Sequence, residues 1–285
     1  MSISFSNKIN PLITVVIPTL NSRQKYLEEA LDSIEKQSYR PHEIIIVNNG
    51  IGDVNVPDYS SSIRHVKTVF KSGAPQARNL GVTLAKTDFV AFLDDDDLWE
   101  KDYLQKMVRH IKNYSPDCLI AKLDQLVDGN ILKYKNAHSM ISKNILLIEN
   151  PGCTDSTMIV KKSSYLKVGG CNAKLTSGYD RALVLEFLLQ KFKIMTAPDC
   201  QAILRQHNNN DRLSGGQNLL EGISKFYKLY KNEMSLYQKI YNNLKFLRYS
   251  WKINKDLLSL GIYIFFFSTL KPIELILKHL NQQEY

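Results

Sequence analysis

The sequence has little of what marks a disulfide-rich or zinc-knuckle protein. Its 285 residues include 4 cysteines and 2 tryptophans, and the cysteines form no C-x-x-C pair. Widely spaced cysteines without such a pair argue against a disulfide framework or a zinc knuckle. We therefore expect reduced thiols in a cytoplasmic protein.

Long hydrophobic runs are also missing. The apolar stretch 12–17 is bracketed by Pro11 and Pro18, and no small-residue cleavage site follows it, so no signal peptide is expected. The most apolar segment, 257–270 (LLSLGIYIFFFSTL), is shorter than the ~20 residues that a membrane-spanning helix needs. The sequence therefore predicts no membrane span.

The charge is basic, and the excess gathers near the C-terminus. The net charge is +9, and residues 217–285 contribute +5 of it, from nine Lys and one Arg against one Asp and four Glu. A basic balance is compatible with nucleic acid, anionic lipid or phosphorylated substrates. Because no recognised nucleic-acid-binding motif is present, we expect no nucleic-acid partner.

Strand and helix patterns alternate along the first two thirds of the chain. The expected strands are 13–19, 43–47, 65–70, 88–93, 118–125, 158–161 and 193–195. Helical spacing is expected near 27–34 and over 74–85, 98–113 and 180–190. This alternation predicts an α/β fold with a doubly wound, mostly parallel sheet flanked by helices. From residue 217 onward the pattern is helical, which predicts a catalytic domain over 1–216 and a C-terminal helical appendage over 217–285.

Three polar clusters follow predicted strands, at 19–21, 48–50 and 94–97. Ligands of doubly wound sheets bind beyond the carboxyl ends of the strands, so one crevice is expected to hold all three. The last cluster consists of four adjacent aspartates, which repel one another unless cations or hydrogen-bond donors compensate them. Carboxylate oxygens suit hard divalent cations such as Mg²⁺. The alternative is a solvated acidic turn.

With these motifs in this order, the chain resembles the family 2 inverting glycosyltransferases over roughly residues 11–215. The segments that carry the resemblance are VVIPTLN at 15–21, EIIIVNNG at 43–50, GAPQARNLG at 73–81, FLDDDDLW at 92–99 and VGGCNAKL at 168–175. The resemblance implies a GT-A fold, a nucleoside-diphosphate-sugar donor and a Mg²⁺ or Mn²⁺ ion. It also implies a single displacement that inverts the anomeric centre.

The resemblance also assigns roles to individual residues. It implies Asp180 as the general base, and Asp96, Asp94 and His207 as metal ligands. Asp97 is expected to cap the next helix, and Arg205 is a candidate for a diphosphate contact. The residues implied for binding the nucleotide sugar are Pro18, Thr19, Leu20, Asn21, Asn48, Asn49, Arg78, Asp94 and Asp95.

Each of these roles has a plainer alternative. Arg78 could be a surface arginine on a helix, and Asp180 could be only a helix N-cap. A lone histidine such as His207 is ordinarily structural or solvated.

The chain departs from the family at the predicted base-binding and acceptor positions. Asn48 and Asn49 stand where an aspartate is common, and an amide can pair with uracil or with cytosine. Leu20 stands where an aromatic residue often stacks on the base, and Tyr179 replaces an acid before Asp180. A UDP-sugar is the donor that we expect first, with CDP or another nucleotide as the alternative.

The expected activity is metal-dependent transfer of a sugar to a hydroxyl of a glycan or lipid-linked acceptor, in bacterial cell-surface polysaccharide synthesis. The substitutions at Asn48 and Tyr179 motivate an alternative, a non-catalytic nucleotide-sugar or glycan-binding protein. Activity is favoured because both the acidic run and Asp180 are present.

The C-terminal region is expected to bind the inner face of the plasma membrane without crossing it. Basic residues at 245, 248, 252 and 255 precede the apolar segment, and Trp251 and several tyrosines are interspersed. This composition suits a helix that lies in the headgroup region. The alternatives are packing on the catalytic domain or a homodimer contact.

Overall fold

The computed structural model describes residues 10–20, 23–70, 72–134, 141–206 and 215–265. The chain divides into two compact units. The first comprises Met1–Ala173 and Tyr179–Asn208, and the second comprises Lys174–Gly178 and Asn209–Tyr285. The predicted boundary between residues 216 and 217 stays a prediction.

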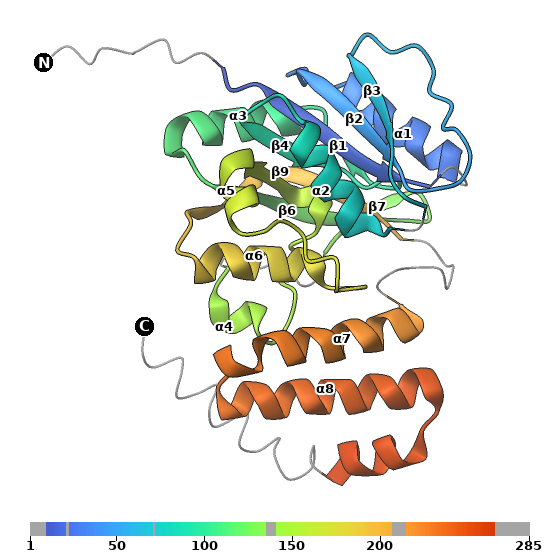
Figure 1. Ribbon diagram of the computed structural model, residues 1–285, viewed down its shortest axis with the longest axis vertical. Helices are drawn as coiled ribbons and strands as arrows, with labels where there is room; N and C mark the ends of the chain where they lie inside the picture. Colours follow the sequence, from blue (N-terminus) through green and yellow to red (C-terminus); the bar gives the residue numbers. More distant parts are fainter. Residues whose placement is uncertain (1–9, 21–22, 71, 135–140, 207–214, 266–285) are drawn as a thin grey trace, which may run out of the picture. The chain divides into compact units, whose positions relative to one another are not determined.

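The first unit is built on one nine-stranded sheet (Figure 1). The strand order is β3-β2-β1-β4-β8-β6-β9-β5, and β7 pairs with β6. The strands are β1 Ile13–Thr19, β2 Glu43–Asn48, β3 Ile63–Lys67, β4 Phe89–Phe92, β5 Leu98–Trp99, β6 Cys118–Val127, β7 Asn130–Lys133, β8 Met158–Lys161 and β9 Ile194–Arg205.

The sheet is parallel in its N-terminal half and mixed beyond β4. β1 pairs in parallel with β2 and β4, and β2 with β3, whereas β8 runs antiparallel to both β4 and β6. The prediction of an α/β fold is confirmed, but the sheet is mixed rather than mostly parallel. A parallel pair needs a long crossover, usually a helix. The described elements between β6 and β8 are β7, the one-turn helix α4 (Lys143–Leu146) and the 3₁₀ helix η2 (Asp155–Thr157). None of them is a long crossover helix, and β8 pairs antiparallel with β6.

Helices cover both faces of the sheet. Residues 13, 15 and 17 of β1 belong to the core cluster with α1 (Gln24–Glu35) and α3 (Tyr103–Tyr114). Val16, on the opposite face, meets Gly81 of α2 (Ala74–Leu84). Figure 1 shows α2 and α5 (Lys162–Lys167) over the near side of the sheet. Because both faces are covered, β1 and β2 are buried throughout and are rich in β-branched residues.

The strand predicted at 65–70 lies at Ile63–Lys67, and two predicted elements differ more because of β9. The helix predicted from Leu98 begins instead at Tyr103, because Leu98 and Trp99 form β5 and pair with β9. The strand predicted at 193–195 continues to Arg205. Pro198 lies within this strand, where a register shift after Ala121 takes residues 198–200 out of the ladder. Proline is tolerated in strands at such bulges.

The four cysteines, Cys118, Cys153, Cys171 and Cys200, are buried free thiols. This agrees with the predicted absence of a disulfide framework. Burial raises the pKa of each thiol.

The described residues from 216 onward are mainly helical, which confirms the predicted C-terminal helices. They include α7 (Gly216–Tyr230), the 3₁₀ helix η3 (Lys231–Glu233), α8 (Leu236–Asn254) and a further helical segment over 257–265. A capping box starts α8: Ser235 Oγ accepts from the Gln238 N–H, and Gln238 Oε1 accepts from the Ser235 N–H. None of the described helices is both long enough and apolar enough to cross a bilayer.

The close approach of α2 to β1 makes Gly81 intolerant of a side chain. A Cβ at this position would lie 2.4 Å from Cγ1 of Val16. We predict that Gly81→Ala lowers the free energy of unfolding, measured in urea, by about 1–3 kcal/mol, the range typical of overpacking.

The matched control is Gly261→Ala, because a Cβ at Gly261 would meet no atom within 4 Å. This variant should be as stable as the parent or slightly more stable. Adding Val16→Ala to Gly81→Ala should make the combined loss smaller than the sum of the two single losses. Strict additivity of the two losses would contradict the contact.

Candidate metal and nucleotide-sugar site

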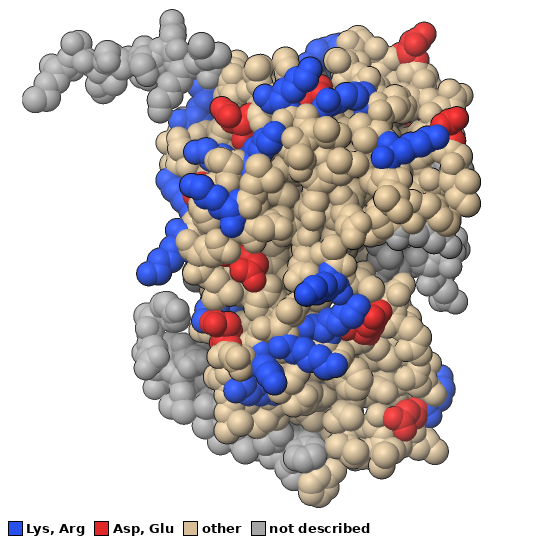
Figure 2. Space-filling view, in the orientation of Figure 1, with Lys and Arg blue, Asp and Glu red and all other residues tan. Residues whose placement is uncertain are grey.

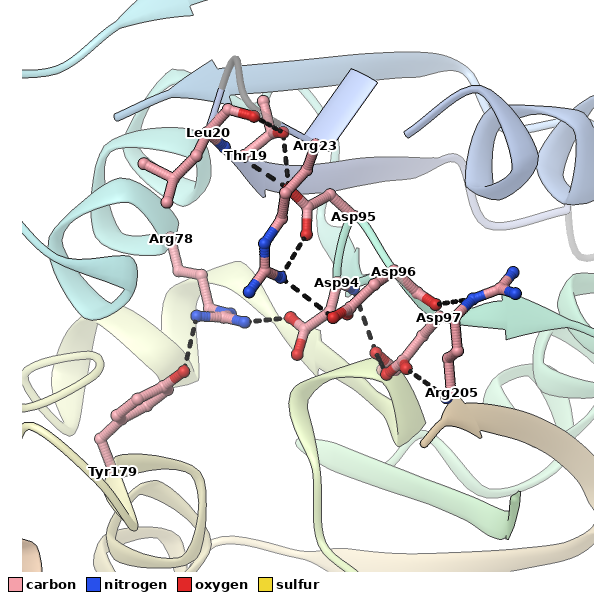
Figure 3. Close-up of polar contacts among 11 residues, drawn as sticks. Thr19, Leu20, Arg23, Arg78, Asp94, Asp95, Asp96, Asp97, Tyr179 and Arg205 are labelled. Atoms are coloured by element: carbon pink, nitrogen blue, oxygen red, sulfur yellow. Dashed lines mark hydrogen bonds and ion pairs between the residues drawn. The ribbon is translucent and has the colours of Figure 1, made fainter. Parts of the chain in front are cut away.

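The acidic run lies at the point where the strand order of the sheet reverses. β1 is flanked by β2 on one side and β4 on the other, and ligands of doubly wound sheets bind at such a switch point. Thr19 ends β1, and Asp94 follows β4 by two positions. The two strand ends are joined because Thr19 Oγ1 donates to Asp95 Oδ2 at 2.6 Å (Figure 3). The structure therefore brings these predicted site residues together.

Asp95 and Asp97 hold the framework of the site. The side chain of Asp95 is 6% exposed and also accepts from the Leu20 N–H at 3.4 Å. Asp97 is fully buried; its Oδ2 accepts from Ser156 Oγ at 2.6 Å and its Oδ1 from the Arg205 N–H at 3.0 Å. The prediction that Asp97 caps the next helix is wrong, because the residue before α3 is Asp102 and Asp97 faces β9 instead.

Asp94 and Asp96 are the more exposed members of the run. Their side chains are 31% and 17% exposed. Carboxylate oxygens of Asp94, Asp96 and Asp97 lie within 4.8 Å of one another. Such a set of hard oxygen donors fits Mg²⁺ or Mn²⁺. The predicted ligand His207 and the predicted nucleotide contact Asn21 lie outside the described residues.

Arg78 lies beneath the acidic run and is 1% exposed. Its Nη2 forms ion pairs with Asp94 and with Asp155, the latter at 3.0 Å, and its Nη1 donates to the Tyr179 hydroxyl at 3.0 Å (Figure 3). The alternative of a surface arginine is therefore wrong. In this arrangement Arg78 neutralises carboxylates, and its predicted contact with nucleotide oxygens stays a prediction.

Four carboxyl groups of the site have raised pKa values. Burial raises the pKa of Asp155 to about 8 and that of Asp95 to about 6, despite the attraction of Arg78 and Arg23 respectively. Burial also raises the pKa of Asp94 and of Asp97. A cluster of carboxyl groups with perturbed pKa values is typical of functional sites.

Asp180 belongs to the same electrostatic cluster, on α6 (Tyr179–Leu189). It is half-buried, and its carboxylate accepts from the Arg181 N–H at 2.6 Å and from Asn150 Nδ2 at 3.2 Å. Burial raises its pKa to about 6, although the Arg181 N–H and the charges of Arg181 and Arg78 oppose this shift. Asp180 is therefore a partly accessible carboxylate that titrates just below neutral pH.

The two asparagines at the end of β2 use their amides within the protein. Asn48 Oδ1 accepts from the Gly50 N–H at 2.8 Å, and its Nδ2 donates to the carbonyl of Gly52 at 2.7 Å. Asn49 Oδ1 accepts from the hydroxyls of Thr68 and Ser72, both at 2.9 Å. Both asparagines are buried, so contact with a base would require exchange of these bonds, and the predicted contact stays a prediction.

The remaining predicted nucleotide contacts lie along the end of β1. Pro18 is buried within the strand, whereas Leu20 is 38% exposed beyond it. Leu20 is thus accessible to a ligand, and its predicted role is untested.

Several residues of the site were not found from the sequence. Arg23 Nη1 lies 3.1 Å from Asp95 Oδ1 and 3.0 Å from Asp96 Oδ2. Asp155 and Ser156 belong to η2, some sixty residues from the acidic run, and no local pattern marks them. Arg205 was expected to contact a diphosphate, but its Nε donates to the carbonyl of Asp96 at 3.0 Å and its Nη2 pairs with Glu29.

The mixed α/β sheet, with the acidic run at its switch point, has the architecture of the GT-A class. The chain belongs to glycosyl transferase family 2, whose model matches residues 14–169.

Curated relatives agree with this family. The chain is 29% identical to the glycosyltransferase GlyA of Streptococcus pneumoniae over 143 residues, 48% of this chain and 19% of GlyA. It is 35% identical to the putative teichuronic acid biosynthesis glycosyltransferase TuaG of Bacillus subtilis over 112 residues, 37% of this chain and 44% of TuaG. In both cases the chain spans less than half the length of the relative.

A solved structure confirms the GT-A fold. It is residues 1–349 of S. aureus TarS in complex with UDP-GlcNAc, with a TM-score of 0.60 and 18% sequence identity. The likeness covers 85% of this chain and 73% of that one.

We predict that Arg78→Met destabilises the protein strongly, because Asp155 would then be buried without its cation and Asp94 would lose its ion pair. Removal of one partner from a buried ion pair costs about 3–5 kcal/mol. Urea denaturation monitored by circular dichroism measures the loss.

Two further variants control for this effect. Arg40→Met removes an arginine that is 58% exposed and paired with Glu35, and it should cost no more than ~1 kcal/mol. Asp155→Asn in the Arg78→Met background should recover part of the stability. If Arg78→Met costs no more than Arg40→Met, the buried ion pair does not hold the site together.

Proposed function

We propose that the chain is a metal-dependent, inverting glycosyltransferase. It transfers a sugar from a nucleoside-diphosphate sugar to a hydroxyl of a glycan or lipid-linked acceptor in bacterial surface polysaccharide synthesis. The observation that carries this proposal is the convergence of Asp94, Asp96 and Asp97, with Asp180 in the same cluster at a pKa of about 6. Membership of family 2 supports sugar transfer, and the name of TuaG supports a polysaccharide product. The UDP-GlcNAc bound to TarS supports UDP as the nucleotide of the donor.

The acidic run is suited to the donor side of the reaction. Asp94 and Asp96, with His207 as a further candidate, would hold Mg²⁺ or Mn²⁺, which neutralises the charge of the departing diphosphate. Thr19 and the Leu20 N–H orient Asp95, and Arg78 orients Asp94. These residues preorganise the carboxylates before the donor arrives.

Asp180 is suited to the acceptor side. The acceptor oxygen attacks the anomeric carbon on the face opposite the diphosphate; the bond to the diphosphate breaks and the configuration inverts. The hydroxyl proton passes to the Asp180 carboxylate, which acts as a general base. Asp155 also has a raised pKa, but it is only 3% exposed and ion-paired to Arg78, so an acceptor has less access to it.

A non-catalytic nucleotide-sugar or glycan-binding protein is the alternative function. Such a protein would need the donor site but no base on the acceptor side. The pKa of Asp180 favours catalysis, because a general base works best with a pKa near the working pH.

We predict that Asp180→Asn loses transfer but keeps donor affinity, because a base acts on the acceptor in the transition state. The loss should be about 10²–10⁴-fold in kcat. In the wild type, kcat/KM should fall about tenfold per pH unit below about pH 6, since the carboxylate must be ionised to accept the proton. The residual activity of Asp180→Asn should lack this acid limb.

Asp102→Asn is the matched control, because Asp102 is an exposed carboxylate paired with Lys106. It should behave as the wild type. Wild-type turnover in Asp180→Asn would refute the base, and a change confined to the donor Kd would make Asp180 a donor ligand. A wild type that binds donor but shows neither transfer nor donor hydrolysis would favour the binding-protein alternative.

The proposal includes docking of the second unit on an anionic membrane. Leu257, Leu258 and Phe265 are 76%, 73% and 64% exposed in the helical segment 257–265. Figure 2 shows several basic side chains over α7 and α8. Exposed apolar side chains close in sequence to basic residues suit a helix in the headgroup region.

We predict that the full chain co-sediments with phosphatidylglycerol vesicles at low salt and much less with phosphatidylcholine vesicles. Each basic residue near an anionic surface contributes about 1 kcal/mol, so Lys252→Gln with Lys255→Gln should weaken binding by at least about tenfold. The matched control, Lys101→Gln with Lys143→Gln, removes the same charge from the first unit. Absence of salt-sensitive binding would refute membrane docking, and concentration-dependent dimerisation instead would support the homodimer contact.

A further inference from the structure

Arg23 lies where a cation of the acidic site is expected. It immediately precedes α1, and its Nη1 contacts carboxylate oxygens of both Asp95 and Asp96, at 3.1 and 3.0 Å (Figure 3). Asp96 belongs to the group whose oxygens converge within 4.8 Å and fit a divalent ion. One guanidinium nitrogen thus bridges two neighbouring carboxylates of the run.

The other two arginines of the site are held differently. Arg78 is 1% exposed and its ion pairs are buried, so its withdrawal would be very costly. The side chain of Arg205 contacts the carbonyl of Asp96 and the carboxylate of Glu29. The side chain of Arg23 is 34% exposed, and ion pairs that reach solvent are easily exchanged.

We propose that Arg23 is an exchangeable internal counterion of the acidic site. In the ligand-free protein it competes with the divalent cation for the carboxylates of the run. When metal and nucleotide bind together, its guanidinium moves to the donor diphosphate. This inference rests on the proposed metal site. A guanidinium and a divalent ion on the same carboxylate repel each other, so both cannot hold Asp96 at full strength. The planar guanidinium also matches the oxygens of a diphosphate.

The consequence is interdependent binding of metal and nucleotide. A metal ion alone adds positive charge to a site where Arg23 already compensates Asp95 and Asp96. A metal ion together with a diphosphate adds charges of both signs, and the diphosphate accepts the arginine that the metal displaces. The coupling is reciprocal, so the nucleotide must strengthen metal binding by the same factor by which the metal strengthens nucleotide binding.

The test is Mn²⁺ affinity, measured by electron paramagnetic resonance of the free ion, with and without saturating UDP. The full chain is compared as wild type, Arg23→Ala, Arg23→Gln and Arg40→Ala. Arg40 is the matched control because it pairs with Glu35 on the surface. Arg23→Gln keeps the polar bulk and gives a second reading if Arg23→Ala folds poorly. Each variant is also measured with Asp96→Asn, because His110, Asp199 and Cys200 form a second group that could take up Mn²⁺.

Without UDP, we expect Arg23→Ala and Arg23→Gln to bind Mn²⁺ at least about tenfold more tightly than the wild type, since a hydrogen bond to a charged group is worth about that factor. Arg40→Ala should match the wild type. With UDP, the wild type should gain more Mn²⁺ affinity than either Arg23 variant does. Asp96→Asn should abolish these differences.

Two outcomes would overturn the inference. If Mn²⁺ binding depends on Asp96 but is unchanged by both Arg23 variants, Arg23 is only a structural ion pair, and the proposed metal site stands. If no variant shows Asp96-dependent Mn²⁺ binding, with or without UDP, the metal site itself is wrong and the inference falls with it.

Discussion

The buried guanidinium of Arg78 is the interaction on which the acidic site depends. It comes from α2 and contacts Asp94 after β4, Asp155 of η2 and Tyr179 of α6. These elements are far apart in the sequence, and each contributes a polar group to one buried cation. Because a buried charge that loses its partner is strongly destabilising, the elements are held in one arrangement. Asp94, at the edge of this network, is thereby fixed in position before any ligand binds.

The rest of the run divides into groups that position the site and groups that are available to a ligand. Asp95 ties the run to the end of β1 through Thr19, and Asp97 ties it to η2 and β9 through Ser156 and the Arg205 N–H. Asp94 and Asp96 are more exposed, and Arg78 and Arg23 respectively contact them. Adjacent carboxylates repel one another, so a bound divalent cation would stabilise the run. Burial raises the pKa of Asp180 to about 6.

Local patterns in the sequence predicted much of the fold and the place of the site. The β-branched runs that became β1 and β2, the helix α2 and the strand that leads into the four aspartates were all identified from residue spacing. Pairings between distant residues were not identified, because the local spacing of apolar residues does not determine strand register or side-chain direction. The mixed sheet, the bond from Ser156 to Asp97 and the bridge from Arg23 to Asp96 are examples. The burial of Arg78 was missed for the same reason, since a helical pattern does not show which charged residue meets a carboxylate from another element.

The central claim is that Asp94 and Asp96 bind a divalent ion together with a nucleoside diphosphate. A thermal-shift panel of UDP, GDP, CDP and dTDP, each with Mn²⁺ or with EDTA, tests it most directly. The account predicts that one nucleotide, UDP in the first instance, stabilises the protein in Mn²⁺ by about 2.7 kcal/mol at 100 times its Kd. This stabilisation should vanish in EDTA and in Asp96→Ala. Stabilisation that is unchanged by EDTA and by Asp96→Ala, or none from any nucleotide with Mn²⁺, would contradict the claim.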